Sequence, residues 1–168
     1  YTAAVFRDPS AWYHVMFVYD TTQATAANRI KVYVNGVQIT TAGGLGLNYP
    51  PQNDLLSVNN TIQHNIDVLL TSYFDGYLAE VNFIDGQALS PYAFGNFNSY
   101  GVWAPVAYSG SYGTNGFLLN FGNTANTTAL GYDSSPQGNN WTTNNFSLTA
   151  GSAYSSMYDV PTLNSATV

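Results

Sequence analysis

The sequence contains WYHVMFVY at residues 12–19 and IKVYVNGVQI at residues 30–39. Both stretches have the alternating pattern of extended strands, and the second is interrupted by Asn35-Gly36. Asn-Gly between alternating apolar residues is a strong hairpin signal, because a type I′ turn needs positive φ at both central residues. We therefore expect a strand over residues 12–19 and a hairpin over residues 30–39. Both faces of the first strand are largely apolar, which predicts a strand covered on both sides.

A second motif, FDGYLAEVNFIDGQALS, occupies residues 74–90. Its residues 77–84 predict a long strand with Glu80 and Asn82 on one face. Ser90-Pro91 then favours one short helical turn, with serine as N-cap and proline at the first helical position. Further strands are expected at residues 55–58, 61–66 and 116–121. The whole pattern predicts an all-β protein, an antiparallel β-sandwich with an extended β-rich C-terminal arm.

The composition excludes several classes of function. The 168 residues suffice for one sandwich with a core, but only 7% are charged and the net charge is −6 with three basic residues. So few cations cannot neutralise a run of phosphates, which excludes nucleic acids as partners. No apolar run reaches the roughly 18 residues of a transmembrane helix, so no membrane insertion is expected. The absence of cysteine excludes disulfides and thiolate metal sites. An extracellular or virion surface location fits these properties.

The motifs at residues 10–92 closely resemble the concanavalin A-like lectin/glucanase superfamily, in its laminin-G and pentraxin-like branch. The shared pattern is Trp-x-His-Val, then Tyr-Val-Asn-Gly, then Phe-x-Gly followed by Glu-Val and Ala-Leu-Ser. This resemblance implies a concanavalin A-like jelly roll of two antiparallel sheets. Residues 115–161 are also similar to structural and tail-fibre-like proteins of marine bacteriophages, which implies a virion context.

The resemblance also suggests how the chain is organised. Residues 1–105 are expected to form the laminin-G-like sandwich, with its N-terminal strands missing. Residues 106–168 are rich in Asn, Thr, Tyr and Gly. We expect this part to be a β segment, a linker or the start of a following module. Its stretch around Asp133-Ser134-Ser135 is similar to a segment that opens the family's domains. The later strands could alternatively complete the same sandwich in permuted order.

No catalytic residues are expected. Glycosidases need two placed carboxylates about 5–9 Å apart, and Glu80 is the only glutamate in the chain. A mid-strand Glu80 is either a structural, hydrogen-bonded acid or a sugar contact on the concave face. With Asn82, and with the loop tyrosines Tyr49 and Tyr73 as stacking surfaces, it forms our predicted ligand-binding set.

Calcium is the family's common cofactor, so the resemblance makes a calcium site possible. Calcium takes six to eight oxygen ligands, and Asp20, Asp75 and Asp85 are the candidates at expected loops or turns. The alternative is that these aspartates stabilise turns through hydrogen bonds to the backbone.

These observations lead to a predicted function. The chain is expected to be a non-catalytic, lectin-like structural module of a virion surface protein, such as a phage fibre, tail or capsid decoration. Its partners would be other subunits of the assembly, copies of itself in a homo-oligomer, and host glycans. The alternatives are a purely structural assembly module without a ligand and a bacterial surface adhesin domain.

Overall fold

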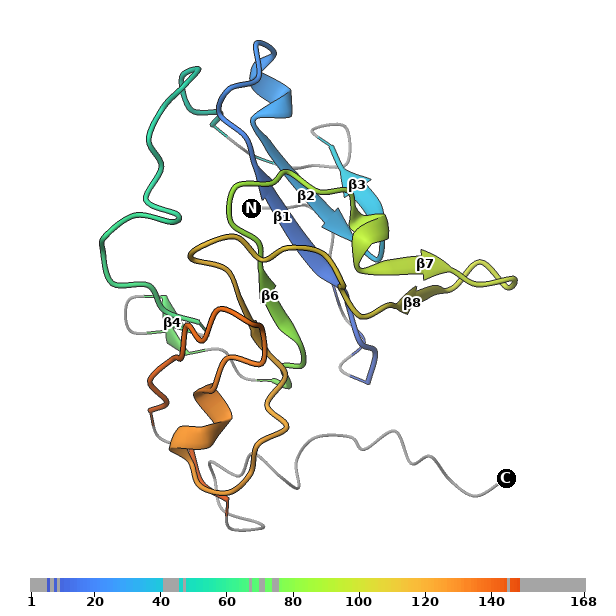
Figure 1. Ribbon diagram of the computed structural model, residues 1–168. Coiled ribbons are helices and arrows are strands. Elements are labelled where there is room, and N and C mark those ends of the chain that lie inside the picture. Colours follow the sequence, from blue (N-terminus) through green and yellow to red (C-terminus); the bar gives the residue numbers. More distant parts are fainter. Residues whose placement is uncertain are drawn as a thin grey trace. The chain divides into compact units, whose positions relative to one another are not determined.

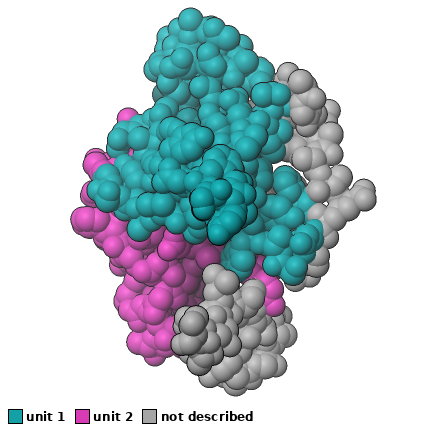
Figure 2. Space-filling view, turned by 90° about the vertical axis from the view of Figure 1, so that its right-hand side faces the viewer, with its two compact units in different colours: residues 1–57, 87–110 teal, residues 58–86, 111–168 magenta. Residues whose placement is uncertain are grey.

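The computed structural model describes residues 6, 8, 10–40, 46, 48–66, 68–69, 72–73, 76–144 and 146–148, without the side chains of 68–69 and 72–73. The chain divides into two compact units, coloured separately in Figure 2. The first consists of Tyr1–Ser57 and Gln87–Gly110, and the second of Val58–Gly86 and Ser111–Val168. The expected C-terminal arm beyond residue 148 lies outside the described residues.

The first unit contains a three-stranded antiparallel sheet in the order β1-β2-β3 (Figure 1). Its strands are β1 (Val15–Tyr19), β2 (Ile30–Val34) and β3 (Val37–Ile39). The hairpin prediction is confirmed, because Asn35 and Gly36 have φ values of 48° and 76° and join β2 to β3. The short 3₁₀ turn η1 (Ala26–Asn28) precedes β2.

A second hairpin of the first unit was not predicted. It pairs β7 (Gly95–Phe97) with β8 (Trp103–Pro105) and follows the 3₁₀ turn η3 (Pro91–Ala93). The predicted helical turn is therefore confirmed, and the Ser90 side chain caps it by accepting a hydrogen bond from the Tyr92 amide.

The Trp103 ring lies at the centre of an aromatic cluster in the first unit. It stacks on His14 at 5.6 Å and meets Phe97 and Tyr92 edge-on at 5.2 and 5.8 Å. A Cβ added at Gly36 or at Gly95 would overlap this ring. The ring therefore requires glycine both in the β2–β3 turn and in β7.

His14 belongs to this aromatic cluster, but within the described residues its side chain is not fully hydrogen-bonded. Its backbone exchanges hydrogen bonds with Asn35, but its Nδ1 atom is buried and has no partner among the described residues. Burial lowers the pKa of His14 because the charged imidazolium would lose its solvation.

The second unit contains two separate strand pairs. The strands β4 (Val68–Leu69) and β5 (Ser72–Tyr73) pair with each other, and β6 (Val81–Phe83) pairs with β9 (Phe117–Leu119). Phe117 stacks on Phe83, at 5.6 Å, and contacts the ring of Trp141, at 4.9 Å, with an angle of 60° between the ring planes. A 3₁₀ turn, η4 (Thr128–Gly131), buries Ala129 and Leu130.

Asp133 ties the loop after η4 to the β6–β9 pair. Its carboxylate accepts hydrogen bonds from the amides of Leu118, Ser135 and Asn139 and from the Ser135 hydroxyl, all at 2.8 Å. Burial alone would raise the pKa of Asp133, but these four hydrogen bonds outweigh it and lower the pKa below its ordinary value.

The all-β, antiparallel class is confirmed, since every described strand pair is antiparallel. The sandwich is confirmed only in part, because the described strands form four separate small sheets. The division of the sequence at residues 105 and 106 stays a prediction.

Three predicted details of the strands are wrong. The strand at residues 12–19 is not covered on both sides, because Val15 and Phe17 are 50% and 58% exposed. The strand predicted at residues 77–84 is reduced to β6, because Glu80 has a φ of 49°, outside the extended region. Residues 55–58 and 61–66 form bends, a turn and irregular backbone instead of strands.

The contact between Gly36 and Trp103 predicts a large effect of a single methyl group. Gly36→Ala should lower the free energy of unfolding by about 2–4 kcal/mol, combining left-handed strain with overpacking against the ring. Gly101→Ala is the matched control, because Gly101 has a similar φ of 74° but no atom near its Cβ position. Urea unfolding measures both variants, and equal losses would contradict the predicted overlap.

The Asp133 hydrogen bonds predict acid sensitivity of the second unit. The folded pKa lies below the unfolded value of about 3.9. The carboxylate therefore stabilises the fold above about pH 4 and loses this contribution as the pH falls through the folded pKa. Asp133→Asn should cost about 1–3 kcal/mol at pH 7, because the amide nitrogen of asparagine cannot accept hydrogen bonds.

Denaturant unfolding at pH 7 and at pH 3 tests this expectation. Asp54→Asn is the control, since Asp54 is exposed and its carboxylate takes part in no hydrogen bond within the described residues. The assignment of Asp133 is refuted if both variants unfold at the same denaturant concentration.

Candidate functional site

A small polar pocket lies on one face of the three-stranded sheet of the first unit. Its volume is about 160 Å³, below the roughly 300 Å³ at which pockets for drug-sized ligands begin. Such a pocket accommodates a single small residue of a ligand. It is lined by Val18, Asp20, Gln23, Asn28, Lys31, Tyr33, Ala88 and Leu89.

The sheet places the side chains at the base of this pocket. Lys31 and Tyr33 are two residues apart on β2 and therefore point to the same face. Val18 of β1 lies directly opposite Lys31 and shares that face. Asp20 and Gln23 come from the loop that leaves β1, and Asn28 comes from the end of η1.

Hydrogen bonds from Arg29 anchor the loop that carries Asp20 and Gln23. The guanidinium donates hydrogen bonds of 2.8–2.9 Å to the carbonyl oxygens of Gln23, Ala24 and Pro50. Asn53 and Gln52 add bonds to the carbonyl oxygens of Thr21 and Thr22. The polar groups of the pocket are thus pre-organised, which reduces the entropic cost of binding a ligand.

Asp20 is ionised in this setting. Its carboxylate accepts hydrogen bonds from the hydroxyl and the amide of Thr22, at 2.6 and 3.1 Å, and from the Gln23 side chain at 2.6 Å. The side-chain bonds to Thr22 and Gln23, with a smaller contribution from Lys31, lower the pKa of Asp20. This geometry agrees with the alternative in which Asp20 stabilises a turn.

The other side chains of the pocket keep unused hydrogen-bonding groups. Within the described residues, no hydrogen bond or ion pair occupies the Lys31 ammonium, the side-chain amide of Asn28 or the Tyr33 hydroxyl. Each carboxylate oxygen of Asp20 also has more than one lone pair. The pocket therefore offers a cation, an amide, a hydroxyl, a carboxylate and an aromatic ring to one ligand.

A second polar cluster belongs to the second unit and is internally satisfied. Asp85 accepts hydrogen bonds from the Asn59 side chain at 2.7 Å and from the Asn115 amide at 3.1 Å. The Asn115 side chain donates to Asn59 at 2.9 Å, and the Tyr112 hydroxyl donates to Asn82 at 3.0 Å. We interpret this cluster as a structural link between three loops.

The predicted ligand-binding set is divided between the two units and stays a prediction. Glu80 is exposed and lies before β6, whereas Asn82 bonds to Tyr112 in the second unit. Tyr49 belongs to the first unit and is half-buried, but it does not line the pocket. Tyr73 lies in β5 rather than in a loop, and its side chain is outside the described residues.

The calcium site at Asp20, Asp75 and Asp85 stays a prediction. Asp20 and Asp85 belong to different units, and both oxygens of each accept hydrogen bonds from N–H or O–H donors. Asp75 lies outside the described residues. The described part of the chain contains no group of three or more His, Cys, Asp or Glu side chains able to hold a metal ion.

Sequence reasoning found Asp20 but missed the pocket around it. It gave no role in ligand binding to Gln23, Asn28, Lys31 or Tyr33. The available signal was the alternation of Lys31 and Tyr33 along β2, which places a cation and an aromatic ring side by side.

Comparison with known proteins supports the resemblance seen in the sequence. The family model described as concanavalin A-like lectin/glucanases superfamily matches residues 2–92, more than half of the chain. No curated protein and no solved structure matches the chain. The matched region contains both the β2–β3 hairpin and every residue that lines the pocket. The chain belongs to the concanavalin A-like lectin/glucanases superfamily.

Proposed function

We propose that this protein is a non-catalytic carbohydrate-binding module and that the pocket of the first unit holds one sugar residue. Membership of the superfamily indicates a lectin-like or structural module. The proposal that the pocket holds a sugar rests on its polar groups that make no hydrogen bond within the described residues, on Lys31, Asn28 and Tyr33. Sugars present hydroxyl groups to amides, carboxylates and cations, and their C–H faces stack on aromatic rings.

The same pocket argues against catalysis. Glycosidases work with two carboxylates, one as general acid and the other as base or nucleophile. The pocket has a single carboxylate, Asp20, and Glu80 is exposed in the other unit. The pocket can therefore orient a sugar, but it lacks the pair of acids needed to cleave a glycosidic bond.

A surface assembly remains our proposal for the context, whether a virion surface or another extracellular structure. The proposal is supported by the composition, with 7% charged residues and many tyrosine and asparagine side chains. Among the described residues there is no helix with the length and apolar character needed to cross a bilayer. A purely structural role is the second candidate, favoured by the exposed apolar side chains of β1.

Glycan binding predicts a specific loss in pocket variants. The full chain is applied to an array of immobilised neutral and acidic oligosaccharides, and saturable binding to a subset of them is expected. Gln23→Ala and Lys31→Ala should each weaken that binding about 5- to 20-fold, the effect of one lost hydrogen bond to a neutral or charged partner. Chelator should leave the binding unchanged, because Asp20 is the one carboxylate among the described residues of the pocket.

Gln38→Ala is the matched control, since Gln38 is exposed on β3, opposite Tyr33, and does not line the pocket. A flat response across the array would refute the proposed function. Equal losses for Gln23→Ala and Gln38→Ala would place the binding site elsewhere.

A further inference from the structure

Lys31 is the one basic side chain among the described residues whose charge has no partner. The chain has three basic residues, Arg7, Arg29 and Lys31. Arg29 donates to three backbone carbonyl oxygens of the neighbouring loops, and Arg7 lies outside the described residues. The Lys31 side chain is half-buried in the wall of the pocket, yet its ammonium makes no hydrogen bond or ion pair within the described part of the chain.

The carboxylate of Asp20 shares the pocket with Lys31 but does not pair with it. Both of its oxygens accept hydrogen bonds, one from Thr22 and the other from Gln23. Lys31 makes the smallest of the contributions that lower the pKa of Asp20, which indicates that the two charges are not in contact. The pocket therefore combines a negative charge that the protein itself stabilises with a positive charge that is available to a ligand.

An ammonium in this position favours an anionic ligand group. Half-burial removes part of its water, and within the described residues no protein group replaces that water. Hydrogen bonds between ionised partners are about twice as strong as those between neutral groups. On the basis of the sugar site proposed above, we infer that the bound sugar residue carries an anionic group, a carboxylate or a sulfate ester, and that Lys31 selects it.

The charge of the whole chain limits the ligand to one such group per site. The net charge is −6, so a polymer that is charged at every residue is repelled by most of the surface. Within the described residues, Lys31 is also the single cation free to pair with it. The ligand that fits both conditions is an isolated acidic residue in an otherwise neutral glycan.

Matched oligosaccharides test this specificity. The full chain is applied to immobilised glucosides, galactosides and mannosides, each with a neutral terminal residue, with the corresponding uronate and with a sulfate ester on that residue. For at least one hexose, an acidic form should bind about 10-fold more tightly than the neutral form, the effect of one charge-assisted hydrogen bond. Preference for the uronate or for the sulfate identifies the anion that the pocket holds.

Lys31→Gln removes the charge and keeps a side chain that can donate hydrogen bonds. It should weaken binding of the preferred acidic form about 10-fold and change binding of the neutral form less than about twofold. Lys31→Arg is the matched control, because it keeps the charge and should therefore retain the acidic preference. Circular dichroism establishes that both variants are folded.

Heparin, a densely sulfated polymer, tests the limit to one charge. Compared at equal concentrations of binding sites, it should bind no more tightly than the singly charged oligosaccharide, because the remaining sulfates find no free cation and are repelled by the negative surface. Tighter binding of heparin would overturn this part of the inference.

The outcomes separate the selectivity from the sugar site itself. A flat response to all forms would refute the proposed function and the inference together. Equal binding of neutral and acidic forms, with a loss in Gln23→Ala, would leave the sugar site in place and overturn the role of Lys31. An acidic preference that persists in Lys31→Gln would also overturn that role, since another cation would then select the ligand.

Discussion

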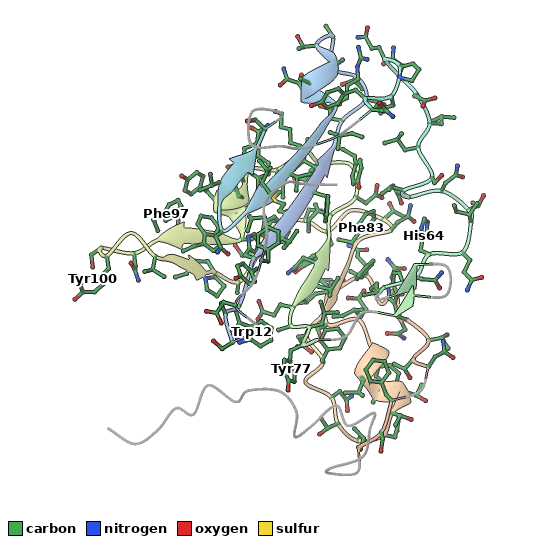
Figure 3. The ribbon with its side chains drawn as sticks, turned by 180° about the vertical axis from the view of Figure 1, so that it is seen from behind. Trp12, His64, Tyr77, Phe83, Phe97 and Tyr100 are labelled. Atoms are coloured by element: carbon green, nitrogen blue, oxygen red, sulfur yellow. The ribbon has the colours of Figure 1, made fainter. Side chains whose placement is uncertain are left out.

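The Trp103 ring is the constraint on which the first unit depends. It lies against Gly36 in the β2–β3 turn and against Gly95 in β7, so neither position has room for a side chain. Through His14 it also contacts the residues just before β1. One ring therefore fixes the orientation of two hairpins. The β7–β8 hairpin presents Tyr100, 90% exposed, at its outer end (Figure 3).

The position of the sheet determines where the pocket lies. With β2 held by its turn, Lys31 and Tyr33 project to one face and Val32 to the other. Arg29, immediately before β2, binds three carbonyl oxygens of the neighbouring loops and keeps Asp20 and Gln23 over the same face. The polar groups of the pocket thus depend on a single strand and the residue that precedes it.

Sequence alone predicted what is local and missed what depends on distant contacts. The turns at Asn35-Gly36 and Ser90-Pro91 follow from the backbone preferences of these residues, so the sequence predicted both. The positive φ of Glu80 has no such signal, so the alternation around it gave a strand that is too long. Alternation also shows which residues share a face of the sheet but not which face is covered, so Phe17 was expected to be buried and is instead 58% exposed.

The size of the pocket has a consequence for the proposed binding. A pocket of about 160 Å³ has room for one sugar ring, which would limit the affinity of a single site. A surface assembly of the kind we propose would carry many copies of the pocket. Many weak sites bind a repetitive glycan surface by avidity, without any added contact within a site. Copy number would thus compensate for the small size of the pocket.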